Sequence, residues 1–190
     1  MKSPRRRFLS AAAGAAALSS CGARWGPWRF FTEQEMATVA ALTDCLIPPD
    51  DLPGAAQAGV PVFLDRQLSG HLRKFRDMYR AGLLELDRAA RKLHQAPFAR
   101  LSAERQTALL QAVEKGKPPD GTFTGLDPAL FFATVRAHTM QGFYGDPRHG
   151  GNRDQVAYLM LGIPATNLRG RSQHDVRLVQ LPGGLPGGRR

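Results

Sequence analysis

The 190-residue sequence contains only two cysteines, Cys21 and Cys45, and no C-x-x-C pair. Structural zinc sites and thioredoxin-like chemistry are built on such pairs, so we expect neither. No C-x-x-C-H motif is present, which excludes the usual covalent attachment of a c-type haem. The chain also lacks G-x-G-x-x-G, phosphate-loop, G-x-S-x-G and H-E-x-x-H motifs. We therefore expect no cofactor, no metal ion and no catalytic residue in this chain.

The charge of the chain is strongly one-sided, with 26 Lys and Arg against 16 Asp and Glu and a formal net charge of +10. Such an excess can indicate a nucleic-acid partner. Here, however, Lys2, Arg5, Arg6 and Arg7 lie at the start of the chain, and two further arginines end it. No helix-turn-helix, zinc or RNA-binding signature accompanies them. We expect no nucleic-acid binding.

The first twenty residues, MKSPRRRFLSAAAGAAALSS, have the basic start and apolar run of a signal peptide (residues 1–20). The apolar run, Ala11 to Leu18, is shorter than the about 20 residues of a membrane-spanning helix. Four residues fit the R-R-x-F-L pattern of the twin-arginine pathway, which exports folded proteins: Arg5, Arg6, Phe8 and Leu9. The leader predicts a periplasmic protein and the twin-arginine translocase as a partner.

The leader ends at Leu18-Ser19-Ser20-Cys21, which is similar to a bacterial lipobox. Cleavage before Cys21 and lipid attachment to its thiol would anchor the protein to a membrane. The alternative is an ordinary cysteine near a conventional cleavage site. Cys45 is then alone in the mature chain, and its apolar neighbours indicate a buried thiol. A disulfide to another subunit is the alternative for Cys45.

Helical periodicity without strong strand alternation predicts an all-α domain, a compact bundle of about five to six helices over residues 32–168. A tether (21–31) precedes it, and a flexible, disordered tail rich in Gly, Pro and Arg (169–190) follows. Thr32 and Glu35 form the capping-box pattern at the first helix, which Pro48 ends. Further helices are expected from Val60, over residues 72–94, from Ser102 to about Glu114, from Asp127-Pro128, and over about residues 153–161.

The segment GFYGDPRHGGNRD, residues 142–154, is the most unusual stretch of the domain. Its glycines permit positive φ and close backbone approach, and Asp146-Pro147 favours a turn. Asn152 or Asp154 is a candidate cap for the last helix, and four charged residues could form a network: Asp146, Arg148, Arg153 and Asp154. These residue types suit a fixed loop better than proton transfer. His138, on the preceding helix, has no partner base or nucleophile, which indicates a hydrogen-bonded structural residue.

Several segments together resemble the gluconate 2-dehydrogenase subunit 3 family, over about Phe30 to Pro164. The first segment runs from Phe31-Thr32-Glu33 to Ile47-Pro48. The next three are AGVPVFLDRQLSG, YRAGLLELDRAA and PFARLSAERQTALL. Most specific is HTMQGFYGDPRHGGNRD, followed by LGIP, which is similar to the family's H-T-x-x-G-x-x-x-D-P-x-x-G-G-N-x-D and later G-x-P. Tyr158 departs from the tryptophan that many relatives carry there.

The resemblance implies a non-catalytic accessory subunit without a cofactor of its own. Its partner would be a large FAD-dependent dehydrogenase of the glucose–methanol–choline (GMC) type, commonly alongside a multi-haem cytochrome c subunit with haem c. The large subunit would oxidise a sugar, sugar acid or polyol, and the small one would help it mature and carry its export signal. The motif residues would then belong to the core or the partner face: His138, Gly142, Asp146, Pro147, Gly150, Gly151, Asn152, Arg153 and Asp154.

The competing hypothesis is a free-standing small periplasmic lipoprotein. It would be either an enzyme that uses His138 and the glycine-rich turn, or a binder of an anionic ligand through Arg148 and Arg153. The missing nucleophile–base pair speaks against the enzyme.

Overall fold

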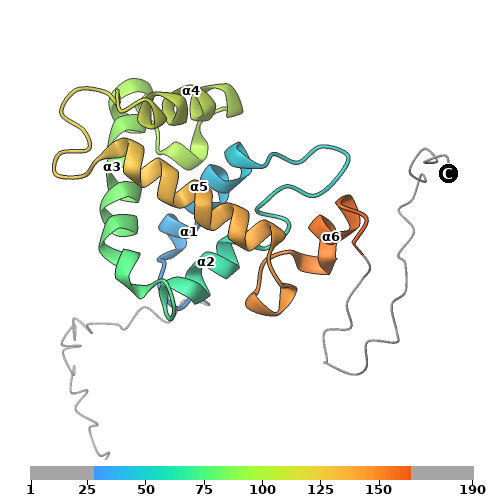
Figure 1. The fold of residues 1–190 in the computed structure, drawn as a ribbon. Helices are drawn as coiled ribbons and strands as arrows, with labels where there is room; N and C mark the ends of the chain where they lie inside the picture. The colour runs from blue at the N-terminus through green and yellow to red at the C-terminus, as the bar shows by residue number, and fades with distance from the viewer. Residues whose placement is uncertain (1–27, 164–190) are drawn as a thin grey trace, which may run out of the picture.

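The computed structural model describes residues 28–163, so the leader, Cys21 and the residues from 164 onward lie outside the described part. Within it, all regular structure is helical, as the sequence predicts (Figure 1). The α-helices are α1 (Glu33–Leu46), α2 (Val60–Leu68), α3 (Arg76–His94), α4 (Ala103–Glu114), α5 (Pro128–Tyr144) and α6 (Val156–Met160). Four short 3-10 helices join them: η1 (Arg73–Phe75), η2 (Phe98–Arg100), η3 (Pro147–His149) and η4 (Arg153–Gln155).

Helix α5 is the central element of the bundle. It crosses the front of the molecule in Figure 1 and contacts α1, α2, α3, α4 and α6. Its inward face carries Phe131, Val135 and Phe143, all nearly inaccessible to solvent. Near its start, α5 also approaches α3 closely, because Gly82 of α3 leaves room for the ring of Phe131. The core is therefore assembled around one helix that comes late in the chain.

Two helix starts follow the capping rules that the sequence indicates. The Thr32 hydroxyl accepts a hydrogen bond from the Glu35 amide (3.2 Å), and the Glu35 carboxylate accepts one from the Thr32 amide (2.7 Å). Asp127 caps α5 by accepting from the amides of Ala129 and Leu130, with Pro128 in the first turn. Ser102 occupies the N-cap position of α4, but its side chain makes no capping hydrogen bond.

A buried carboxylate on α2 holds the start of the described chain. Asp65 is only 3% exposed and accepts three hydrogen bonds from consecutive backbone amides, those of Arg29 (2.7 Å), Phe30 (2.8 Å) and Phe31 (3.0 Å). A buried carboxylate is stable only with such partners. Because of this clamp, the end of the expected tether is bound to α2, and Phe31 is part of the core.

Two buried acids on α3 act in the same way on later loops. Asp87 accepts a hydrogen bond from the Phe98 amide (3.0 Å) at the start of η2. Glu85 accepts one from the Phe123 amide (2.7 Å), in the loop before α5. Each bond satisfies a buried amide that has no partner within a helix. These carboxylates fix the path of the loops and hence the faces that the helices present.

We predict that Asp65→Asn lowers the free energy of unfolding by about 2–3 kcal/mol, because one oxygen acceptor and the charge that strengthens three hydrogen bonds are lost. The measurement is urea-induced unfolding followed by circular dichroism. Asp77→Asn is the control, since Asp77 is an exposed acid and its change should cost less than about 0.5 kcal/mol. Equal effects of the two substitutions would contradict the clamp.

Candidate functional site

The segment 142–154 begins inside the last turn of α5, where Gly142 packs directly against α2. A β-carbon at residue 142 would lie 2.7 Å from Cδ1 of Phe63 and 3.2 Å from Cγ1 of Val60. The first distance is shorter than real side-chain contacts allow, so any larger residue would push the two helices apart. The glycine is therefore required by the packing of α5 on α2.

A second glycine brings the loop back onto α5. A β-carbon at Gly151 would overlap the carbonyl oxygen of Gly142. The loop thus contacts the backbone of α5 without an intervening side chain. Gly150 supplies the sharp turn just before this contact, with φ of 105°, a conformation that residues with a side chain rarely adopt.

Asn152 is the residue that holds the loop closed. It is fully buried, its amide nitrogen donates to the Gly145 carbonyl (2.9 Å), and its amide oxygen accepts from the Ala157 amide (2.9 Å). Gln155 occupies the N-cap position of α6, but the first-turn amide of Ala157 is bound by the side chain of Asn152 and not by that of Asp154. One residue later, the backbone N–H of Arg153 donates to the carbonyl of Ala58 (2.8 Å), just before α2. The loop is bonded to α5, α6 and the segment before α2.

The charged side chains of the loop form one ion pair instead of the four-residue network that the sequence suggests. Nη2 and Nε of Arg148 donate to Oδ2 of Asp146, at 2.6 and 2.9 Å, and Nε also approaches Oδ1 at 3.1 Å. Asp146 Oδ1 accepts a further hydrogen bond from the Arg148 amide. These hydrogen bonds lower the pKa of Asp146 and raise the pKa of Arg148. Arg153 and Asp154 are exposed and take part in no ion pair within residues 28–163. The guanidinium of Arg148 is therefore already paired with an acid of its own loop.

His138 is part of the core, where α5 meets α3 and η1. It is 5% exposed, its Nδ1 lies 3.1 Å from the hydroxyl of Tyr79, and the ring of Phe75 packs edge-on against it at 4.8 Å. Burial, followed by the nearby charge of Lys74, lowers the pKa of His138. Burial also raises the pKa of Tyr79, so the phenol stays protonated. A neutral histidine that is hydrogen-bonded to a neutral phenol and packed against aromatic rings has a structural role.

Cys45 lies on α1, half-buried, with its Sγ 3.5 Å from the amide oxygen of Gln106. Burial raises the pKa of its thiol, so the reactive thiolate is disfavoured. Within residues 28–163, no group of three or more His, Cys, Asp and Glu residues is placed to hold a metal ion. The described residues also include no helix long and apolar enough to span a membrane.

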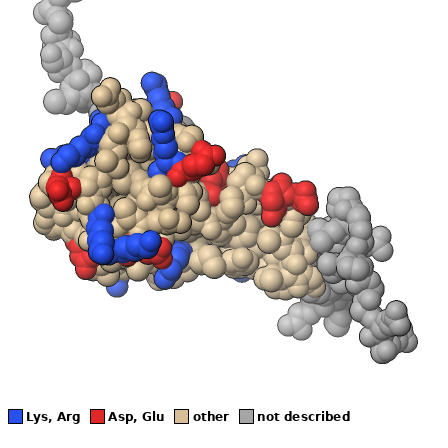
Figure 2. All heavy atoms as spheres, turned by 90° about the horizontal axis from the view of Figure 1, so that it is seen from above, with Lys and Arg blue, Asp and Glu red and all other residues tan. Residues whose placement is uncertain are grey.

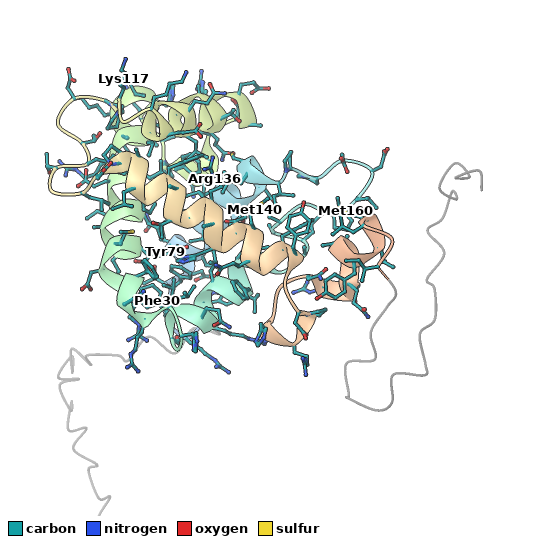
Figure 3. The ribbon with its side chains drawn as sticks, viewed as in Figure 1. Phe30, Tyr79, Lys117, Arg136, Met140 and Met160 are labelled. Carbon is teal, nitrogen blue, oxygen red and sulfur yellow. The ribbon has the colours of Figure 1, made fainter. Side chains whose placement is uncertain are left out.

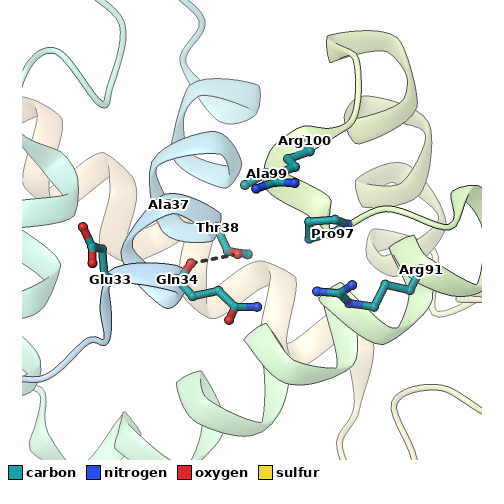
Figure 4. Close-up of a pocket in the computed structure, with 8 residues that line it drawn as sticks. All are labelled: Glu33, Gln34, Ala37, Thr38, Arg91, Pro97, Ala99 and Arg100. Carbon is teal, nitrogen blue, oxygen red and sulfur yellow. Dashed lines mark hydrogen bonds between the residues drawn. The ribbon is translucent and has the colours of Figure 1, made fainter. Parts of the chain in front are cut away.

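A groove of about 590 Å³ lies between α1, the end of α3 and η2, far along the chain from the glycine-rich loop (Figure 4). It is lined by Glu33, Gln34, Ala37, Thr38, Arg91, Pro97, Ala99 and Arg100. Thr38 donates to the Gln34 carbonyl, and Gln34 donates to Asp87, so these polar groups are bonded within the protein. Glu33 lies on the α1 side of the groove, and Arg91 and Arg100 lie on the other side (Figure 4). The lining residues include no nucleophile–base pair.

An apolar stripe on the outer face of α5 is the feature that sequence reading missed. Exposed residues recur on it every three or four positions: Leu130, Ala133, Ala137, Met140 and Tyr144. Helix α6, which contacts α5, adds exposed Met160, and Leu161 and Ile163 follow it (Figure 3). The spacing is that of helices that pack against a neighbouring helix, but here the face is open. Contiguous exposed apolar surface is typical of an interaction site.

Fold and site together define a small all-α protein whose glycine-rich loop is built into its core. The family model for gluconate 2-dehydrogenase subunit 3 matches residues 33–164, from α1 to just beyond α6. The chain therefore belongs to the gluconate 2-dehydrogenase subunit 3 family, a subunit of a dehydrogenase complex. No curated protein and no solved structure matched the chain.

We predict that Gly151→Ala destabilises the protein by about 3 kcal/mol or more, because the added methyl group has only backbone to move against. Thermal unfolding followed by circular dichroism measures the effect. Gly70→Ala is the matched control, since its β-carbon would meet nothing closer than 3.7 Å and its φ is ordinary. A Gly151→Ala protein as stable as the Gly70→Ala protein would disprove the direct contact between loop and helix.

A second prediction concerns the pH dependence that His138 contributes. The pKa of His138 is lower in the folded than in the unfolded chain. As the pH falls, His138 therefore becomes protonated in the unfolded chain first, which favours unfolding. The free energy of unfolding that neutral His138 contributes is fully present above its unfolded pKa, and it is lost as the pH falls toward its folded pKa. Between about pH 7.5 and about pH 5, the wild type should lose more unfolding free energy than His138→Gln. Parallel pH profiles in urea titrations would show that His138 is not held neutral.

Proposed function

We propose that this chain is a non-catalytic accessory subunit of a membrane-attached, FAD-dependent dehydrogenase of the GMC type. The observation that carries the proposal is the family match, which extends over nearly the whole described domain. In this complex the large subunit binds FAD and oxidises a sugar, sugar acid or polyol. A multi-haem cytochrome c subunit then takes the electrons.

The geometry of the glycine-rich loop supports an accessory role. Gly142 and Gly151 serve a backbone contact, and Asn152 is fully buried with both ends of its amide bonded. His138 faces Tyr79, and Arg148 is paired with Asp146. None of these groups is free to meet a substrate. Of the two arginines that an anion binder would use, only Arg153 has no ion pair within residues 28–163. Both points favour the accessory subunit over a free-standing enzyme or anion binder.

The exposed stripe of α5 is the face that we assign to the large subunit. It is defined by Leu130, Ala133, Ala137, Met140 and Tyr144, which share one side of a 17-residue helix. A subunit that works only in a complex must bury such a surface against its partner, because leaving it in water is unfavourable. The partner surface that fits is an apolar helix or groove of the dehydrogenase.

The leader supplies the second part of the proposal. Arg5, Arg6, Phe8 and Leu9 would direct the chain to the twin-arginine translocase, and Cys21 would carry the lipid anchor. A flavoprotein that folds around FAD in the cytoplasm has to be exported folded. Bound to this subunit, it would mature and leave through the same signal, and the complex would remain on the periplasmic side of the membrane.

Met140→Glu should reduce the flavoprotein that copurifies with this subunit by about tenfold or more, because it places a charge in the middle of the apolar stripe. The readout is flavin absorbance per mole of affinity-tagged subunit isolated from solubilised membranes. Leu84→Glu is the matched control: Leu84 is also an exposed apolar residue on a long helix, α3, but lies off the stripe. If both variants retain flavin equally, the α5 face is not the docking surface.

A further inference from the structure

One corner of the described domain holds most of its unbalanced positive charge. Residues 28–163 are nearly neutral, with 16 Lys and Arg against 15 Asp and Glu. Yet the stretch from the end of α2 through η1 into α3 carries five exposed cations and one exposed acid, Asp77. The cations are Arg66, Arg73, Lys74, Arg76 and Arg80. We call this stretch, together with Arg29, the basic corner.

Most cations of the basic corner are left without an acidic partner. Arg80 pairs with Glu35 at 2.6 Å, but the other five enter no ion pair within the described residues. Arg76 is held by a hydrogen bond to the Leu68 carbonyl (2.7 Å) and by its position over the ring of Phe30, at 5.4 Å. Its remaining donors stay exposed. The corner therefore keeps a net positive charge that faces solvent.

The chain enters the domain at this same corner. The Asp65 clamp binds the amides of residues 29–31, and Asp65 is the neighbour of Arg66 in α2. Six residues lie between Cys21 and Trp28, so the two α-carbons are seven steps apart and at most about 25 Å from each other. This step rests on the lipid anchor of the proposed function: a lipid on Cys21 would hold the basic corner close to the membrane surface.

The opposite end of the bundle has a different charge pattern. In the view from above, which shows the end that carries α4, Lys and Arg alternate with Asp and Glu (Figure 2). Figure 3 places Lys117 at this end and Phe30, with the basic corner, at the other. Arg105, Lys115 and Lys117 are exposed here, with Glu104 and Glu114 close in sequence. The net positive charge of the described domain is therefore concentrated at the basic corner and not at the α4 end.

We propose that the basic corner lies against the anionic phospholipid headgroups of the membrane. Its cations are exposed and spread over two helices and a turn, which suits a flat anionic surface better than a single bound anion. Lys and Arg near an anionic bilayer each strengthen binding by about fivefold. In this orientation the α2–α3 corner faces the lipid, and the stripe on α5 remains free for the dehydrogenase.

The test measures vesicle binding by the full chain carrying Cys21→Ser, which removes the lipid anchor and needs no dehydrogenase. The probes are phosphatidylcholine vesicles with and without phosphatidylglycerol, and binding is measured by co-sedimentation. The corner variant combines Arg66→Gln, Arg73→Gln and Lys74→Gln. The control variant combines Arg105→Gln, Lys115→Gln and Lys117→Gln, which removes the same charge from the α4 end. Thermal unfolding checks that both variants fold.

We expect that vesicle binding requires phosphatidylglycerol. The corner variant should bind at least about tenfold more weakly, whereas the affinity of the control variant should change by less than about threefold. Equal weakening of the two variants would mean that only net charge matters, and would overturn the proposal. Binding that ignores phosphatidylglycerol would also overturn it. So would a corner variant that binds phosphatidylglycerol vesicles as tightly as the Cys21→Ser chain, since the cations of the corner would then not meet the lipid. Because the vesicles contain no dehydrogenase, the result is independent of the accessory role.

Discussion

Helix α5 can lie against α2 and against its own following loop only because residue 142 has no side chain. The Gly142 carbonyl is met by Gly151, and its α-carbon faces Phe63 and Val60. Asn152 then bonds the loop at both ends, and the Arg153 amide joins it to the segment before α2. This backbone contact places α5 at the centre of the bundle and leaves its outer face, with the apolar stripe, directed to solvent. The glycine-rich motif thus acts by fixing the position of α5, whose outer face carries the stripe.

Buried carboxylates complete the arrangement by fixing the loops. Asp65, Glu85 and Asp87 each bind backbone amides remote in sequence. Each pays for its desolvation with charge-assisted hydrogen bonds that a neutral side chain could not supply as well. Asp65 is the most consequential, since it decides where the chain enters the domain and therefore which corner would face the proposed lipid anchor. The two proposed surfaces, the α5 stripe and the basic corner, follow from these two constraints.

Much of this structure could be predicted from local signals in the sequence. The all-α class, the Thr32–Glu35 capping box and the Asp127–Pro128 helix start depend on residues a few positions apart, and all three predictions are confirmed. Contacts between distant residues were not visible: the partners of Asp65 lie 34 or more positions away. A hydrophobic pattern within one helix also does not record where the neighbouring helices end: Leu93 of α3 is apolar, yet it is 53% exposed. For the same reason the stripe on α5 could be recognised as unpartnered only from the packed structure.

The central claim is that this subunit works in a complex with a flavoprotein. The most direct measurement is to tag the wild-type chain at its C-terminus, solubilise the membranes gently, purify the tagged protein and record its visible spectrum. The account predicts a larger copurifying subunit with flavin absorbance, and a haem Soret band if the cytochrome is also bound. A colourless, single chain with an activity of its own that His138→Ala abolishes would contradict it.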